Sequence, residues 1–280
     1  VVDTAFWITM IIFQIPAGLV GDRYGRKTVL FYGEALYAVG ILAFGISTEF
    51  FQLLVSNIVW AFGVCFIVSG DTPFVYDTLI ELRRSDEFMR IMGTANALML
   101  FMNAAACVVG GIIAQETNRL ELTLIVSALV GLVGSFTALA LKEPKVDRRD
   151  LGSYRTQFRI GIKRVFFSRA VLILVLFQIL IQVAVYVMAV FRSVYMNVVL
   201  NLDYLEIGAF FGSFCIVGGI LTREASRIEG WLGEKRSLVF MFVSIFVSFV
   251  IVFLVKSPIV IIMQYMIYAV ADMQGPIIGG

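Results

Sequence analysis

Apolar residues in this chain come in long uninterrupted blocks rather than in the periodic stripes of a water-soluble protein. A helix that crosses the hydrocarbon core of a bilayer needs roughly 20 mostly apolar residues. Backbone polar groups in lipid must be satisfied within their own segment, so such blocks predict spanning helices rather than strands. The expected fold class is therefore an all-α polytopic membrane protein. Nine blocks meet or approach the required length, at about residues 1–20, 28–47, 50–72, 92–114, 121–141, 170–191, 205–222, 237–255 and 258–280.

The amino-acid composition supports a membrane protein and excludes several kinds of functional site. Hydrophobic residues make up 60% of the chain and the mean hydropathy is +0.94. The chain has no histidine, which excludes histidine-based metal sites, catalytic triads and proton relays. Cys65, Cys107 and Cys215 each lie within an apolar block and form no CxxC pair, so we expect small core residues rather than ligands. We expect no cofactor, no metal and no nucleic-acid partner.

The distribution of positive charge predicts the orientation in the membrane. Nineteen of the 22 lysine and arginine residues fall in the loops after the first, third, fifth and seventh predicted spans. The positive-inside rule places these loops in the cytoplasm, and residue 1 is then outside. We expect a multi-pass protein of the plasma membrane that contacts lipid and functions as a monomer.

The longest polar stretch divides the chain into two parts. We expect an N-terminal helical bundle over residues 1–141, a cytoplasmic basic linker over 142–169 and a C-terminal helical bundle over 170–280. Helical spacing in the linker favours an amphipathic helix on the inner leaflet, and a solvated basic linker is the alternative. The two bundles look like copies, because GDRYGRKTVL matches EGWLGEKRSL and SGDTPFVYD matches ADMQGPIIG. A parallel repeat of this kind is typical of transporters.

The ten residues GLVGDRYGRK, from Gly18 to Lys27, connect the first two spans. A connection so short, charged and rich in glycine predicts a tight turn with fixed charge partners. It closely resembles the loop between helices two and three of the major facilitator superfamily, G-x-L-a-D-r-x-G-r-k-x-x-l. The matching positions are Gly18, Gly21, Asp22, Arg23, Gly25, Arg26, Lys27 and Leu30, with Val20 in place of the leucine.

The resemblance extends over the whole chain. It implies a fold of two pseudo-symmetric six-helix bundles, truncated at both ends, with the nine visible spans as family helices two to ten. The segment SGDTPFVYDTL also resembles exporter-like members of the superfamily. A second motif, found in the fifth helix of the drug-efflux branch, is kept only in part, which weakens the antiporter interpretation. Gly93, Gly110 and Gly111 are kept, whereas Met102, Ala106 and Cys107 replace Gly, Gly and Pro.

The resemblance further implies that the charged loop acts as a conformational latch. Asp22 would lie near the positive end of a neighbouring helix, and Arg23 or Arg26 would pair with Asp77 at the inner end of the third span. Such pairs would hold the cytoplasmic side closed in one state and break in the other. The alternative is that the positive charges only fix orientation. The expected latch comprises Gly18, Asp22, Arg23, Gly25, Arg26, Lys27 and Asp77.

Acidic residues inside the spans are candidates for binding a substrate or a coupling ion. A charge at the centre of a spanning helix costs about 2.5–3.5 kcal/mol, so each one needs a physical reason. Glu34, Asp71 and Asp272 all fall in the inner third of their spans. They could line the cytoplasmic half of a cavity, bind a cation or carry a proton. The alternative, favoured for Glu34, is that they cap helix ends or pair with loop arginines.

Neutral polar residues give a second set of candidates. Gln178 and Gln182 lie four residues apart on one helical face, and Asn96 and Asn103 lie seven apart on another. Amides are costly against lipid, so these faces should point into the bundle. They are candidates for hydrogen bonds to substrate, and the alternative is that they only connect helices.

Together these features favour a secondary active transporter of a small molecule that works by alternating access. Coupling to protons or another ion is expected, and export is somewhat favoured. The alternatives are an importer of a metabolite or sugar and a non-transporting receptor or scaffold. An integral membrane enzyme is disfavoured, because the sequence shows no catalytic constellation and no Walker-type phosphate loop.

Overall fold

The computed structural model describes residues 2–145 and 193–232, together with positions 172, 186, 243, 247 and 250. These residues belong to two compact units. Residues 2–145 and 204–232 are part of the first, and residues 193–203 are part of the second. The span predicted at 258–280, nearly all of the spans at 170–191 and 237–255, and the linker after residue 145 lie outside the described residues.

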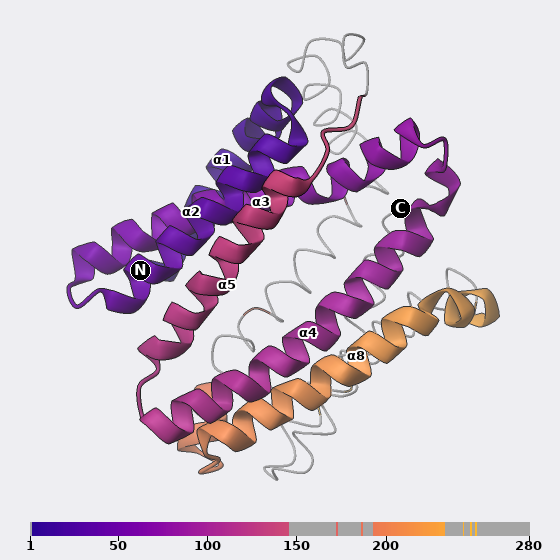
Figure 1. Cartoon of the computed structure of the whole chain (residues 1–280). Helices are drawn as coiled ribbons and strands as arrows, with labels where there is room; N and C mark the ends of the chain where they lie inside the picture. Colours follow the sequence, from indigo (N-terminus) through magenta and orange to yellow (C-terminus); the bar gives the residue numbers. More distant parts are fainter. Residues whose placement is uncertain are drawn as a thin grey trace. The chain divides into compact units, whose positions relative to one another are not determined.

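The described part of the first unit consists of helices and short connections, without a strand (Figure 1). Among the described residues, five helices are long and apolar enough to cross a membrane, which agrees with the first five predicted spans. The elements are α1 (Val2–Tyr24), α2 (Arg26–Ile46), α3 (Phe50–Glu81), the 3-10 turn η1 (Ser85–Glu87), α4 (Phe88–Thr117), α5 (Glu121–Ala140) and α8 (Tyr204–Leu232). In the second unit, residues 193–198 are helical.

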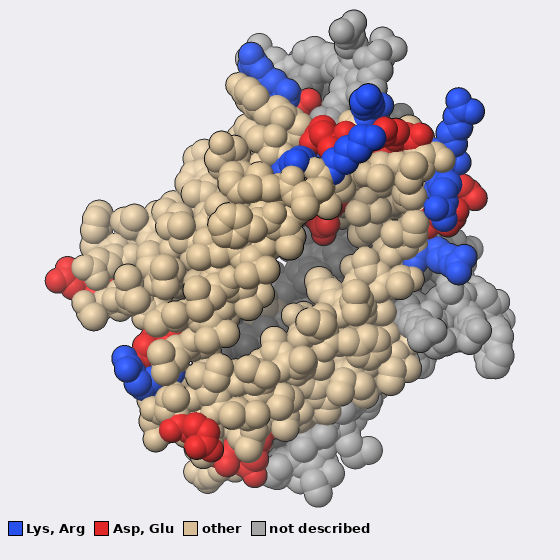
Figure 2. All heavy atoms as spheres, viewed as in Figure 1, with Lys and Arg blue, Asp and Glu red and all other residues tan. Residues whose placement is uncertain are grey.

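Two helices run well past the spans that hydropathy predicts. The third span was expected to end at residue 72, but α3 continues to Glu81, and α8 continues beyond the predicted 222 to Leu232. Hydropathy marks the length that suits lipid, whereas the backbone stays helical through the polar residues that follow. Figure 2 shows the same division, because charged side chains gather near helix ends and almost all of the visible length between them is uncharged.

Helix α2 packs between α3 and α5 through small residues. A Cβ atom added at Gly63 of α3 would lie 2.3 Å from the backbone nitrogen of Tyr37, so the α2 and α3 backbones are in direct contact. On the other side, a Cβ atom at Gly131 of α5 would lie 3.2 Å from the Cβ of Ala38. Close approach through glycine is the usual way in which helices associate in lipid, where apolar side chains alone give no preference for another helix.

Helices α1 and α3 run in the same direction, with aromatic contacts between them. Phe6 packs edge-on against Trp60 with ring centroids 5.4 Å apart, and Phe13 lies 4.4 Å from Phe62. Further along both helices, Gln14 Nε2 donates to the Ser69 hydroxyl at 3.3 Å. This register brings the end of α1, the start of α2 and the last third of α3 together.

Helices α4 and α8 form a second closely packed pair and run antiparallel. A Cβ atom added at Gly208 would lie 2.5 Å from the Cys107 carbonyl oxygen and 3.0 Å from the Cα of Gly111. At the start of α8, the Tyr204 amide donates to the side-chain oxygen of Gln115 at 3.2 Å. Gly208 and Gly212, four residues apart in α8, therefore both face α4.

Candidate functional site

The connection between α1 and α2 is a single residue. Helix α1 ends at Tyr24, α2 begins at Arg26, and Gly25 between them has a φ of 99°. This left-handed region is open to glycine and strained for residues with a side chain. The Gly25 amide still bonds to the Gly21 carbonyl at 3.1 Å, so the chain reverses within one turn. The tight turn that the sequence predicts is present.

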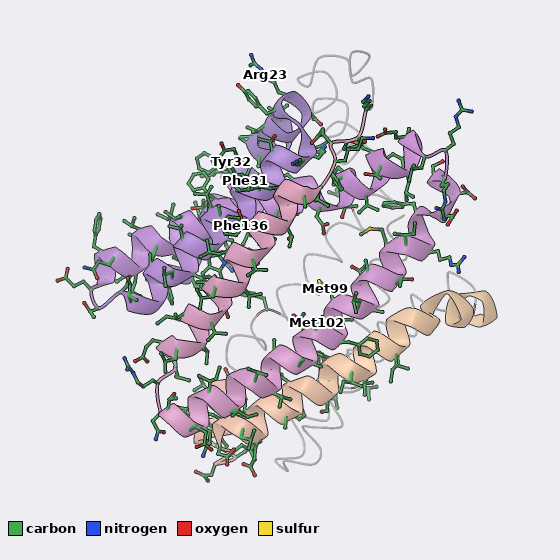
Figure 3. All side chains as sticks on the ribbon, in the orientation of Figure 1. Arg23, Phe31, Tyr32, Met99, Met102 and Phe136 are labelled. Atoms are coloured by element: carbon green, nitrogen blue, oxygen red, sulfur yellow. The ribbon has the colours of Figure 1, made fainter. Side chains whose placement is uncertain are left out.

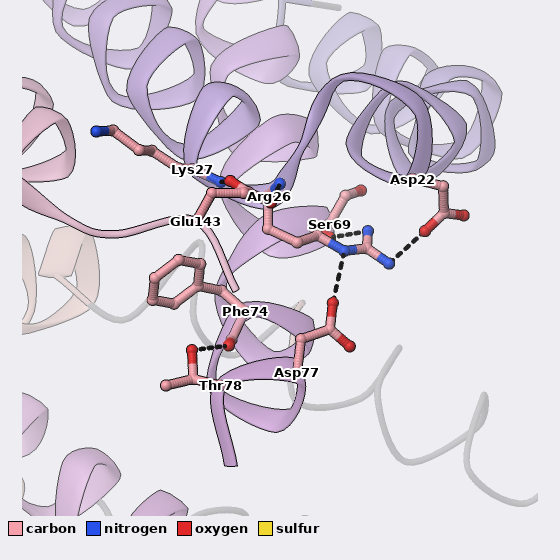
Figure 4. A network of polar contacts seen from close by, with 8 residues as sticks. All are labelled: Asp22, Arg26, Lys27, Ser69, Phe74, Asp77, Thr78 and Glu143. Carbon is pink, nitrogen blue, oxygen red and sulfur yellow. Dashed lines mark hydrogen bonds and ion pairs between the residues drawn. The ribbon is translucent and has the colours of Figure 1, made fainter. Parts of the chain in front are cut away.

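Arg26 is the centre of the polar network at this turn (Figure 4). Its Nη2 atom forms an ion pair with Asp22 of α1, one helical turn back, and its Nε atom lies 3.8 Å from Asp77 of α3. The side chains of Arg26 and Asp77 are only 13% and 15% exposed. At 3.8 Å the Asp77 contact is an ion pair without a hydrogen bond. Arg26 therefore carries charge contacts to two helices at once.

The backbone of α3 is also a partner of Arg26. Nη1 donates to the Ser69 carbonyl oxygen at 3.1 Å. The guanidinium reaches this oxygen across Gly21, where an added Cβ would lie 2.8 Å from Nη1. The small residue at position 21 therefore leaves the space that the arginine needs.

Glu143 caps the start of α2 from a distant part of the sequence. Its two carboxylate oxygens accept the backbone amides of Arg26 and Lys27, each at 2.7 Å. Gly25 has no side chain to cap these amides, so Glu143 supplies the missing acceptor together with a negative charge at the positive end of the helix. An added Cβ at Gly25 would lie 2.9 Å from the Glu143 carboxyl carbon, so the glycine also makes room for this cap.

Residues 142–145 are held at two points. Glu143 is bound to the start of α2, and the Lys145 amide donates to Glu81 at the end of α3 at 2.9 Å. Pro144 between these attachments is buried. We call residues 142–145 the clasp, because this short segment fastens the chain leaving α5 to both α2 and α3.

The remaining members of the expected latch lie in different surroundings from those of Asp22, Arg26 and Asp77. Arg23 is exposed, lies 5.5 Å from the ring centroid of Tyr24, and points away from the helices (Figure 3). Of the two arginines considered for Asp77, it is Arg26 that lies beside it. Lys27 contributes its backbone amide to the Glu143 cap. A Cβ atom at Gly18 would meet nothing within 4 Å, so this glycine is not required for packing among the described residues.

The acidic candidates inside the spans have different surroundings in the structure. Glu34 of α2 faces α5, where an added Cβ at Gly134 would lie 3.1 Å from its Oε2 atom. Asp71 of α3 is exposed and close enough to act electrostatically on Glu34. Asn96 of α4 is partly exposed. Asp272, Gln178 and Gln182 lie outside the described residues.

Three residues of this network were not predicted from the sequence. Gln14 and Ser69 connect α1 to α3, and Glu143 caps α2. The distance of 117 residues between Glu143 and Arg26 hides that contact from any local pattern. Ser69 carries a recognisable signal, because it stands four residues before Pro73 in a helix. Within the described residues, no group of three or more cysteine and acidic side chains is arranged to hold a metal ion.

Long apolar helices, small-residue contacts between them and a charged one-residue turn define a polytopic helical membrane protein. The model of the Major Facilitator Superfamily matches residues 1–278. The chain therefore belongs to this superfamily, as its charged loop indicated. This membership agrees with the helices of membrane-spanning length in the described residues.

Curated proteins with similar sequences are named for multidrug resistance or as a transporter. Multidrug resistance protein 1 of Bacillus subtilis (strain 168) is 24% identical over 172 residues, which cover 61% of this chain and 43% of that protein. Multidrug resistance protein 2 of the same organism is 24% identical over 181 residues, 61% of this chain and 44% of that protein. An uncharacterized transporter of Buchnera aphidicola is 26% identical over 98 residues, 35% of this chain and 24% of that protein. The chain thus matches less than half the length of these relatives.

Proposed function

We propose that the protein is a secondary active transporter that exports small molecules by alternating access, driven by a proton or other ion gradient across the plasma membrane. The observation that carries the proposal is the Arg26 network, which links α1 and α3 through Asp22 and Asp77. The names of the two Bacillus relatives support export over import.

The proposed latch is the set formed by Asp22, Arg26 and Asp77. Breaking an ion pair with little exposure costs about 3–5 kcal/mol if one charge is left without a partner, so such a contact favours one arrangement strongly. Asp22 keeps 38% of its side chain exposed. We propose that this exposed part meets the positive end of a neighbouring helix when the cytoplasmic side is closed.

The proposed coupling-ion and substrate contacts come from the acidic and amide candidates. Asp71 is exposed on α3, whereas Glu34 faces Gly134 of α5. Asp71 is therefore the better placed of these two to meet a cation or to exchange a proton. Asp272, Asn96, Gln178 and Gln182 remain candidates for the same role.

Transport by Asp22→Asn tests the latch. Wild-type protein in liposomes, given a pH jump and a panel of fluorescent small molecules, should move at least one compound in response to the gradient. Asp22→Asn should insert normally and lose this transport, because a neutral amide cannot hold Arg26 as a carboxylate does. Arg23→Gln, which changes an exposed charge of the same loop, is the matched control and should transport normally.

Each outcome has a distinct meaning. Normal transport by Asp22→Asn would contradict the latch while leaving transport itself in place. Uptake in the inward direction only would favour the importer, and binding without gradient-driven movement would favour a receptor. Product formation without a gradient would point to an enzyme instead.

A further inference from the structure

The carbonyl oxygen of Ser69 has lost its usual partner within α3. In an α-helix this oxygen accepts the amide of the residue four positions later. That residue is Pro73, which lies inside α3 and has no amide hydrogen. Ser69 is 8% exposed, so water is a poor substitute. An unpaired buried carbonyl costs about 1–3 kcal/mol, and helices that contain proline usually satisfy it in another way.

Arg26 donates to this oxygen. Its Nη1 atom lies 3.1 Å from the Ser69 carbonyl oxygen, while the other guanidinium nitrogens face Asp22 and Asp77 (Figure 4). The hydroxyl of Ser69 is engaged separately, because it donates to the Gln14 carbonyl at 3.4 Å and accepts from Gln14 Nε2 at 3.3 Å. Arg26 therefore donates to the carbonyl oxygen of Ser69, the atom that Pro73 leaves without a donor from the helix.

The surroundings are shaped for this contact. Gly21 leaves room for the guanidinium, as an added Cβ would lie 2.8 Å from Nη1. Gly70, the next residue after Ser69, lets the start of α2 approach α3, because an added Cβ there would lie 3.4 Å from the Arg26 carbonyl oxygen. Two glycines on two helices thus open the path between Arg26 and the break in the α3 hydrogen bonds.

We propose that Arg26 completes α3, with its guanidinium replacing the amide hydrogen that Pro73 lacks, so that the closed α1–α2 turn holds α3 in its helical form at this point. When Arg26 withdraws, the Ser69 carbonyl loses its donor and α3 opens locally at Pro73. Arg26 is then a positioning residue for α3 as well as a charge partner of the acids. The inference deepens the proposed latch, but its test measures α3 directly and needs no substrate, so the two can fail separately.

Hydrogen–deuterium exchange on protein in lipid nanodiscs tests the proposal through a double-mutant cycle. The four proteins are wild type, Arg26→Gln, Pro73→Ala and the double variant. Arg26→Gln should speed exchange of the α3 amides at residues 71, 72 and 74–77 by about tenfold when Pro73 is present, because local opening is easier once the hydrogen bond from Arg26 is gone. With Pro73→Ala the helix has its own donor, so the same arginine change should speed exchange less than about twofold.

Lys27→Gln is the matched control, because it removes a neighbouring positive charge and keeps the backbone amide that Glu143 accepts. It should leave α3 exchange unchanged with either residue at position 73. If Arg26→Gln fails to insert, Arg26→Lys gives the same cycle, since one ammonium group cannot reproduce the guanidinium's separate contacts. Equal acceleration in both backgrounds, acceleration in neither, or the same effect from Lys27→Gln would each overturn the proposal.

Discussion

Gly18, Gly21 and Gly25 look alike in the loop motif, but the structure separates them by what a side chain would meet. A Cβ atom would meet nothing within 4 Å at Gly18, the Arg26 guanidinium at Gly21 and the Glu143 carboxylate at Gly25. Only Gly25 also has a left-handed backbone. The motif therefore combines a glycine for the turn with one that makes room for the arginine.

Gly25→Ala should destabilise the protein by about 1–3 kcal/mol, because alanine is strained at this φ and its methyl group would displace the Glu143 cap. Gly18→Ala, the matched control within the same loop, should be neutral or slightly stabilising, since alanine favours the helix. Thermal unfolding of the detergent-solubilised variants measures both changes. Equal stability of the two variants would contradict the role assigned to Gly25.

At the scale of single residues, the sequence predicted where the polar network around Arg26 lies, but it did not predict all of the residue pairs that form it. The pairing of Asp77 with an arginine was expected, but charge alone could not choose between Arg23 and Arg26. That choice follows from direction along the helix, because Arg23 points outward and Arg26 begins α2 beside α3. Glu143 was out of reach, since its role depends on how α5 returns the chain to the turn.

At the scale of elements, the α4–α8 pair shows that the glycine pattern alone does not reveal which glycines contact another helix. Of the three glycines kept from the drug-efflux motif, Gly93 and Gly110 would have no atom within 4 Å of an added Cβ, whereas Gly111 would lie 2.7 Å from the Tyr204 carbonyl oxygen. The sequence does not identify the partner helix, because a glycine-rich face fits any helix that approaches it.

Gly111→Ala should therefore weaken the packing of α4 against α8, while Gly110→Ala should not. The added methyl group at position 111 would overlap the α8 backbone, and overpacking of this kind costs about 1–3 kcal/mol. The neighbouring control should change stability by less than about 0.5 kcal/mol. Thermal unfolding in nanodiscs compares the two, and an equal loss at both positions would contradict the contact.

At the scale of the whole molecule, the apolar blocks were sufficient to predict the helical class and the first five spans. They could not predict the polar continuation of α3, because hydropathy records the environment of a helix and not its length. The hydrogen bonds of the clasp join three loops that the charge pattern had assigned to one side: the turn at Gly25, the end of α3 and the segment after α5.

The predicted orientation can be tested with single cysteines in a variant whose three native cysteines are replaced. Asp86→Cys lies in the exposed loop after α3, and Glu116→Cys is exposed at the end of α4. In intact cells an impermeant maleimide should label position 116 at once and position 86 only after permeabilisation, because the basic loops face the cytoplasm. The reverse pattern would place residue 1 inside.

The clasp has a mechanical consequence. A pull on the chain beyond Lys145 reaches Glu81 at the end of α3 before it reaches α5, and next it reaches the Glu143 carboxylate on α2. Force from that direction is therefore delivered to the two helix ends that flank Arg26. A domain fused or a reporter inserted after residue 145 would load the same two attachments. An insertion between residues 141 and 143 would leave both attachments in place and lengthen only the connection between α5 and the clasp.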